Sequence, residues 1–360
     1  MLFDVAPTWS DEVVLAQRMS ELEELASTYW WLVVVEKIQR RKKPDYHSFI
    51  GSGKLDEIIE EMKEKNLHVL IIGNILKPGQ LYNINKLLEP LKKTCRDRVD
   101  LILKIFQNHA QSAEAQLQIE LAAIKHMWPR IFGMGLDMSR QWWWIGTKWI
   151  WETNTERMKR HLKDRKLEIE HKLEEYENMR SLHRSNRIRN HLQTVGLVGY
   201  TNAGKSSLMR LLTKKDVLVE DKLFATLWTT TGKVFIENPV WRGKEILLTD
   251  TIWFIRDLPP QLIKAFSSTL EDSIQSDILI QVVDCTDADL YEKVNVVNDI
   301  LNEIWAIQPK VYVFNKIDLL NPEQLAELEK TYAYLNPIFI STQNQLWIDK
   351  LKGRLDEMTK

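Results

Sequence analysis

The segment from Gly199 to Ser206 reads GYTNAGKS, which fits the phosphate-binding pattern G-x-x-x-x-G-K-[ST]. Its glycines let successive backbone N–H groups curl around a phosphate at a helix N-terminus, where the dipole favours an anion. The Lys205 ammonium would neutralise β and γ oxygens, and the Ser206 hydroxyl would coordinate Mg²⁺. An apolar strand, TVGLVG, precedes the loop and an apolar helix, SSLMRLL, follows it. We therefore predict that the segment binds a nucleoside triphosphate.

A second motif, NKID, runs from Asn315 to Asp318 and follows the β-branched run VYVF. A carboxylate accepts hydrogen bonds and donates none, so Asp318 can pair with both N1–H and the N2 amine of guanine. Adenine offers no such pair of donors. The predicted base is therefore guanine, and Ser341 and Thr342 of IFISTQN are placed to lend backbone contacts to it.

Two further segments are predicted to complete the metal site. In ILLTDTIWFI, Asp250 ends an apolar strand and would hold Mg²⁺ through water. The threonine-rich segment DKLFATLWTTTGK is placed as the first switch loop, with Thr226 as the Mg²⁺ ligand and Thr230 as its competitor. The predicted nucleotide contacts are Gly199, Tyr200, Thr201, Asn202, Ala203, Gly204, Lys205, Ser206, Phe224, Ala225, Thr226, Leu227, Trp228, Asp250, Thr251, Ile252, Trp253, Asn315, Lys316, Ile317, Asp318, Ser341 and Thr342.

These residues need a sheet to position them, and the pattern of elements predicts two α/β domains. Residues 1–130 alternate amphipathic helices with short β-branched runs, which is typical of a small domain with a largely parallel sheet. The helices are predicted over 12–27, 54–66 and 80–91, the strands over 31–38 and 68–73, and one long helix over 98–128. Residues 191–360 alternate again and carry the nucleotide motifs.

Between these domains, residues 131–190 contain a loop and the second long helix of a predicted antiparallel hairpin. An apolar stripe indicates the face that packs on the first helix: Met158, Leu162, Ile169, Leu173 and Tyr176. The helix ends in a basic stretch: Arg180, Arg184, Arg187 and Arg189. This stretch is either a solvated helix face or a contact with a phosphate backbone.

Composition excludes several classes of protein. In 360 residues, 28% are charged and 44% hydrophobic, which is the balance of a folded globular chain. The net charge of -1 gives no indication of a nucleic-acid partner. Cys95 and Cys285 show no clustering that would suit disulfides or zinc, and no apolar run reaches the roughly 18 residues of a membrane span. We therefore expect a cytoplasmic protein without a membrane span.

Several longer motifs resemble those of the HflX family of translation-factor-class GTPases. They are GYTNAGKSSL, LFATL, DTIWFIRDLPPQLIKAFSSTLED, NKID, FIGSGKLDEI, AEAQLQIELA and WPRIFGMGLDMSRQWWWIGTKWIWET, and together they span nearly the whole chain. The resemblance implies an α/β fold: a Ras-like P-loop G domain with a mixed, mostly parallel sheet, an N-terminal α/β domain and a long antiparallel helical hairpin.

The resemblance also implies a GTP hydrolase that binds the large ribosomal subunit and its rRNA, and that splits or rescues stalled ribosomes. No DNA partner is implied, and we expect a monomer. Catalysis would rest on Lys205, Asn202 and Asp250, with Mg²⁺ held by Ser206, Thr226 and, through water, Asp250. Phe254 stands where many GTPases carry a glutamine, so slow turnover accelerated by the ribosome is expected. Asn202 occupies a position that can help to hold K⁺ in related enzymes.

The chain departs from the family pattern at tryptophans. Family glycines stand where this chain has Trp142, Trp143, Trp144, Trp149, Trp151 and Trp253, and aspartate is usual at Trp228. The cluster could be an aromatic platform for unpaired bases, a surface buried in a partner or membrane interface, or a set of replaced glycines, which is the interpretation that we favour. Since Trp253 adds a ring beside the γ-phosphate, we expect weakened γ-phosphate sensing with GDP binding retained.

Two alternatives to the leading hypothesis stay open. The chain could be a nucleotide-regulated RNA-binding module with little catalysis. The N-terminal domain could be an ATPase with a second nucleotide site at the tetrad Gly51–Lys54, GSGK, although we favour a turn entering the next helix for so short a stretch.

Overall fold

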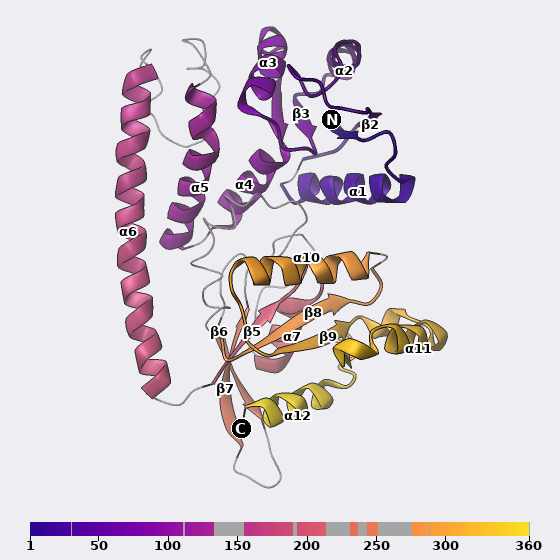
Figure 1. Ribbon diagram of the computed structural model, residues 1–360, viewed down its shortest axis with the longest axis vertical. Helices are drawn as coiled ribbons and strands as arrows, with labels where there is room; N and C mark the ends of the chain where they lie inside the picture. The colour runs from indigo at the N-terminus through magenta and orange to yellow at the C-terminus, as the bar shows by residue number, and fades with distance from the viewer. Residues whose placement is uncertain are drawn as a thin grey trace. The chain divides into compact units, whose positions relative to one another are not determined.

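The computed structural model describes residues 1–29, 31–110, 112–132, 155–189, 193–213, 231–236, 243–250, 276–287 and 289–359. These residues form two compact units. The first unit comprises Met1–Asn108 and Gln116–Leu173, and the second comprises His109–Ala115 and Glu174–Lys360. Figure 1 follows the chain through both.

The first unit is built on a four-stranded parallel sheet in the order β2-β1-β3-β4. Its strands are β1 (Leu2–Ala6), β2 (Glu36–Arg40), β3 (Val69–Ile72) and β4 (Thr94–Asp97). Its helices are α1 (Glu12–Thr28), α2 (Ser52–Glu64), α3 (Pro78–Leu88), the 3-10 turn η1 (Glu89–Leu91) and α4 (Arg98–His109). The predicted N-terminal α/β domain with a parallel sheet is confirmed.

Three details of this sheet differ from the sequence prediction. The strand expected over 31–38 lies at Glu36–Arg40, and Leu32 and Val34 before it are exposed. Strands β1 and β4 were not predicted, because each has four or five residues and β4, TCRD, is mostly polar. Strand β1 lies between β2 and β3, and β4 pairs with β3 at the edge of the sheet, so their place is decided by pairing with strands distant in sequence.

The long helix predicted over 98–128 is wrong as a single element. It is divided into α4, which ends at His109, and α5 (Ala113–Phe132). The Ser112 hydroxyl accepts a hydrogen bond from the backbone N–H of Ala115 at 3.3 Å, which starts a new helix. Apolar periodicity continues through the break and therefore conceals it.

Helix α4 begins at a buried acidic pair. The Asp97 carboxylate accepts from the N–H of Asp100 at 2.9 Å and from the N–H of Leu76 at 3.4 Å. His126 Nε2 on α5 lies 3.6 Å from Asp97 and 3.5 Å from Asp100. Because these acids satisfy the helix start and face the histidine, their burial has a structural cause.

The helical hairpin consists of α5 and α6 (Thr155–Arg189), which lie side by side in Figure 1. Ile169 is fully buried against Leu121 and Ile124, with Leu162 and Leu173 partly buried around them. Arg165 donates to both carboxylate oxygens of Glu120 at 2.7 Å. The predicted stripe is confirmed at Leu162, Ile169 and Leu173, whereas the side chain of Met158 and those of the terminal arginines are outside the described residues.

The second unit contains a six-stranded sheet in the order β10-β9-β8-β5-β7-β6, parallel except for the β6–β7 pair. Its strands are β5 (Thr194–Val198), β6 (Thr231–Ile236), β7 (Lys244–Asp250), β8 (Ile278–Asp284), β9 (Lys310–Asn315) and β10 (Ile338–Phe339). Its helices are α7 (Lys205–Thr213), α10 (Leu290–Glu303), η4 (Ile317–Leu319), α11 (Pro322–Thr331), η5 (Ala333–Leu335) and α12 (Ile348–Met358). The predicted mixed, mostly parallel sheet is confirmed.

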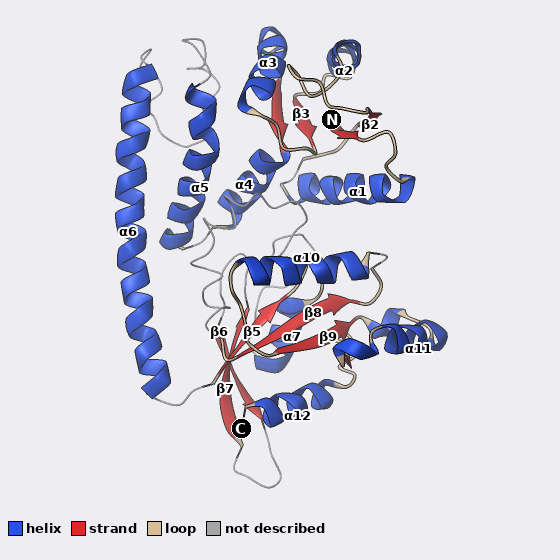
Figure 2. Ribbon diagram, viewed as in Figure 1, coloured by secondary structure: helices blue, strands red, loops and turns tan. Residues whose placement is uncertain are grey.

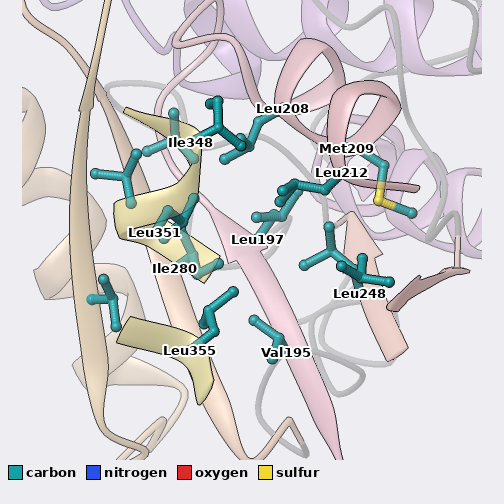
Figure 3. Packing of buried hydrophobic residues seen from close by; sticks show 14 of the residues in the cluster. Val195, Leu197, Leu208, Met209, Leu212, Leu248, Ile280, Ile348, Leu351 and Leu355 are labelled. Atoms are coloured by element: carbon teal, nitrogen blue, oxygen red, sulfur yellow. The ribbon is translucent and has the colours of Figure 1, made fainter. Parts of the chain in front are cut away.

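Helices cover both faces of this sheet, as Figure 2 shows, with α10 on one face and α7 and α12 on the other. Leu208, Met209 and Leu212 of α7 and Leu351 and Leu355 of α12 pack on the central strands (Figure 3). This apolar layer holds α7, and with it the loop that precedes α7, against the carboxyl ends of the strands. Among the described helices, none combines the length and apolar character needed to cross a membrane.

Candidate nucleotide-binding site

The loop between β5 and α7 has a backbone path that only glycine allows at two positions. Gly199 has a φ of 152°, and a Cβ there would lie 2.3 Å from the carbonyl oxygen of Val282. Gly204 has a φ of 94°, and a Cβ there would lie 2.2 Å from Asn315 Nδ2. Both glycines of the motif are therefore required by close approach of a neighbouring strand or loop.

Lys205 is the first residue of α7, and its side chain is completely buried. Its ammonium donates to the carbonyl oxygens of Gly199 at 2.7 Å and Tyr200 at 2.6 Å. Burial lowers the pKa of Lys205 to about 7, while the nearby Asp250 charge acts in the opposite direction. The loop thus holds a lysine whose charge an arriving anion would stabilise.

Ser206 and Asp250 form the second polar pair of the loop. The register of β5 and β7 pairs Leu197 with Asp250, which brings the carboxylate to the loop. The Ser206 hydroxyl donates to Asp250 Oδ2 at 3.2 Å, and both residues are buried. A hydroxyl and a carboxylate are the hard oxygen donors that Mg²⁺ prefers, so this pair fits the predicted ion.

Hydrogen bonds join the NKID turn to the phosphate-binding loop. Asn315 Nδ2 donates to the carbonyl oxygen of Ala203 at 3.0 Å, and Asn315 Oδ1 accepts from the N–H of Thr342 at 3.0 Å. The Ser341 hydroxyl donates to Asp318 Oδ1 at 2.5 Å and accepts from the N–H of Asn344 at 3.0 Å. One buried asparagine thus holds three chain segments in register.

Lys316 is held by an acid that the sequence analysis missed. Its φ is 67°, and its Nζ lies 2.6 Å from Asp284 Oδ2, where Asp284 ends β8 opposite Asn315. The signal was present, because ILIQVVD is an apolar run that ends in an acid at the same sheet edge as Asp250. Ile317 is buried beneath the turn.

The structure places the other loop residues as follows. Tyr200, Thr201 and Ala203 are buried, and the ring of Tyr200 lies 4.8 Å from Lys293 Nζ. Asn202 is exposed at the loop tip with a φ of 60°. The predicted switch residues fall outside the described part of the chain: Phe224, Ala225, Thr226, Leu227, Trp228, Thr230, Thr251, Ile252, Trp253 and Phe254.

The GSGK tetrad of the first unit is a helix start. Gly51 is the N-cap of α2, and its N–H donates to the Gln39 side chain at 3.1 Å. This geometry is that of the turn entering a helix.

A mostly parallel sheet whose strands carry a phosphate-binding loop, an acid and an NKID turn at one edge defines the class of P-loop GTP-binding domains. Three family descriptions match the chain: GTP-binding GTPase N-terminal over residues 16–107, GTP-binding GTPase Middle Region over 109–187, and 50S ribosome-binding GTPase over 194–316. A relative named GTPase HflX is 40% identical over 336 residues, 93% of this chain, so the chain belongs to the HflX family of GTPases.

Relatives named GTPase HflX support this assignment. The protein from Caldanaerobacter subterraneus is 40% identical over 336 residues, which cover 93% of this chain and 75% of the relative. The protein from Escherichia coli is 38% identical over 346 residues, which cover 94% and 78%. That from Methanocaldococcus jannaschii is 36% identical over 345 residues, which cover 94% and 82%.

Solved structures agree with the fold. The complex of SsGBP with GDP aligns with a TM-score of 0.53 at 28% identity, covering 99% of this chain and 98% of that chain. A GTP-binding protein from the archaeon Sulfolobus solfataricus in complex with GDP gives a TM-score of 0.50 at 27% identity, with the same coverage.

Proposed function

We propose that this chain hydrolyses GTP to GDP and phosphate, associates with the large ribosomal subunit, and splits or rescues stalled ribosomes. The observation that carries the nucleotide part is the hydrogen-bonded link between the two motifs. Asn315 bonds to the phosphate-binding loop through Ala203, while the adjacent Asp318 is oriented by Ser341. A phosphate-binding and a guanine-binding group are thereby held at one edge of one sheet.

The residues of the site have separate roles in the proposed reaction. Asp318 and the Ser341–Thr342 backbone bind guanine, and the N–H groups of the loop with Lys205 bind the phosphates. Mg²⁺ held by Ser206, Asp250 through water and Thr226 would neutralise charge on the β and γ oxygens. The predicted contacts at 224–228 and 251–253 would come from the two switch segments.

Few side chains of the proposed site could position the attacking water. Phe254 cannot orient a water, so we propose slow intrinsic turnover that the ribosome accelerates. Asn202 at the exposed loop tip is proposed to help hold K⁺, which would add positive charge near the transferred phosphate.

The partner and location belong to the same proposal. Residues 194–316 match a family described as a 50S ribosome-binding GTPase, and the hairpin carries the basic end of α6. We propose a cytoplasmic, partly ribosome-associated monomer that binds rRNA rather than DNA. Its parts would be an N-terminal domain over 1–130, a loop and helix over 131–190, and a G domain over 191–360.

Steady-state phosphate release with and without large ribosomal subunits tests this proposal. We expect release above background with GTP that rises severalfold with the subunits. Asp318→Asn serves as the matched variant, because an amide can donate to the C2 carbonyl of xanthine but cannot accept both guanine donors. It should lose turnover of GTP and gain turnover of xanthosine triphosphate.

The second candidate function is a nucleotide-regulated RNA-binding module, which the tryptophan at the DxxG glycine position favours. Tight GDP binding without phosphate release, and without any response to ribosomal subunits, would support this candidate over the GTPase.

A further inference from the structure

Two tryptophans of the second unit have a left-handed backbone conformation. Trp305 has a φ of 59° and Trp347 a φ of 58°. A non-glycine residue in this region is uncommon, and asparagine and aspartate are enriched there severalfold. The tryptophan ring cannot hydrogen-bond to its own backbone as those short polar side chains do.

Trp305 ends α10 in a hydrogen-bonding pattern that usually contains glycine. Its N–H bonds to the carbonyl of Asn302 at 3.1 Å, and the N–H of Ala306 bonds to the carbonyl of Leu301 at 2.9 Å. These two bonds place residue 305 at the left-handed position of a Schellman motif. The side chain is 81% exposed, so ring packing does not offset the strain.

The same motif ends α2 with a residue better suited to it. The N–H of Asn66 bonds to the carbonyl of Lys63 at 3.1 Å, and the N–H of Leu67 bonds to the carbonyl of Met62 at 2.9 Å. Asn66 has a φ of 50°. The left-handed position of the motif is therefore occupied by a favoured residue, Asn66, at the end of α2 and by an unfavoured one, Trp305, at the end of α10.

Trp347 lies between the guanine-binding segment and α12. The segment is closed by backbone bonds between Ser341 and Leu346, and α12 begins at Ile348, which is buried in the core. Trp347 is thus the left-handed N-cap residue that joins this closed segment to α12. Its ring stays 39% exposed, with Lys350 Nζ 4.4 Å from the ring centroid.

The frequency of these cases argues against chance. The structure describes the backbone of Trp9, Trp31, Trp128, Trp305 and Trp347, and two of these five are left-handed. With a few per cent of non-glycine residues in that region, the chance of two in five is on the order of 1%. The chain also has 14 tryptophans and 13 glycines in 360 residues, about half of the usual ~7% glycine.

We propose that residues 305 and 347 are glycine positions, and that the protein made in its own cell carries glycine there. The motif tryptophans at 142, 143, 144, 149, 151 and 253 would then be glycines as well. One codon, read as tryptophan in this sequence and as glycine in that cell, would account for all of these positions. The proposal rests on backbone conformation and composition, and therefore stands apart from the proposed reaction.

The conformational part is tested by urea unfolding of Trp305→Gly, Trp305→Ala and the corresponding pair at 347, followed by far-UV circular dichroism. Left-handed strain of an L-residue is removed by glycine and kept by alanine. Each glycine variant should lower the unfolding equilibrium constant about fivefold relative to its alanine partner. Equal stability of the glycine and alanine variants at both positions would overturn this part.

The identity part is tested by peptide mass spectrometry of the protein purified from its cell of origin. Peptides that span residues 305 and 347 should have the mass expected for glycine. Tryptophan in either peptide would overturn the proposal, whatever the unfolding experiment shows.

Discussion

At the scale of the residue, the site is dominated by polar side chains buried beside one another. Lys205, Ser206, Asp250 and Asn315 are each 5% exposed or less, and each bonds to a neighbouring loop or strand. Buried polar groups are stable only when such partners are present. Binding of a nucleotide would therefore exchange existing hydrogen bonds for new ones and would be sensitive to protonation.

Lys205 makes GDP affinity depend on pH. Its pKa in the free protein is lowered to about 7, and phosphate oxygens favour the charged form, so the pKa rises on binding. Above pH 7 the complex therefore takes up a proton, and affinity should be constant below pH 7 and fall by up to about tenfold per unit above it. Calorimetry at pH 8 in buffers of different ionisation enthalpy measures this uptake.

The control for this experiment is Lys205→Met, which fills similar space without a titratable group. It should bind GDP more weakly and with no proton uptake at pH 8. Equal uptake by both proteins would show that another group is responsible.

At the scale of the element, the hairpin depends on one small apolar contact and a few ion pairs. Ile169 is the fully buried residue of α6 among those described, and it meets Leu121 and Ile124 of α5. The Arg165–Glu120 pair is about a quarter to a third exposed, so solvent screens it and its contribution is small. The apolar contact should therefore set the stability of the helix pair.

Ile169→Ala tests this ranking. Removal of a fully buried isoleucine should lower the free energy of unfolding by about 2–4 kcal/mol. Leu167→Ala, at a position 56% exposed on the same helix, should change it by less than about 0.5 kcal/mol. Urea unfolding gives both values, and similar losses for the two variants would contradict the packing described for α5 and α6.

At the scale of the whole molecule, the described residues of the candidate nucleotide site all belong to one of the two units. The first has a four-stranded parallel sheet with its own apolar core, and the second holds every described residue of the candidate nucleotide site. The GSGK tetrad in the first unit forms a helix start. The effects of guanine-nucleotide binding should therefore be detected in the second unit.

Hydrogen exchange with and without saturating GDP measures this directly. Protection should increase over residues 199–206, 315–318 and 341–346, because bound nucleotide stabilises the native state of the segments that contact it. Exchange in α2, Ser52–Glu64, should be unchanged. Strong protection of α2 would revive the second nucleotide site that the sequence suggested.

How much of the fold and of the site the sequence predicts depends on how far apart in the chain the residues that interact lie. The phosphate-binding loop, the NKID turn, Asp250 and the parallel sheets were predictable, because a motif or a run of apolar residues carries each one locally. Asp284, which holds Lys316, was missed because its role requires β8 and β9 to be neighbours. The break between α4 and α5 was missed because the apolar pattern continues across it.

The sequence by itself determined the class of ligand and much of the alternation of helices and strands, since both are encoded in residues close together in the chain. Tertiary structure decided which atoms meet: Asn315 with Ala203, Ser341 with Asp318, and Asp284 with Lys316. It also showed that Trp305 and Trp347 occupy backbone conformations suited to glycine. The physical reason is that packing of strands and helices distant in sequence sets both the register of the loops and the φ angles at which they must turn.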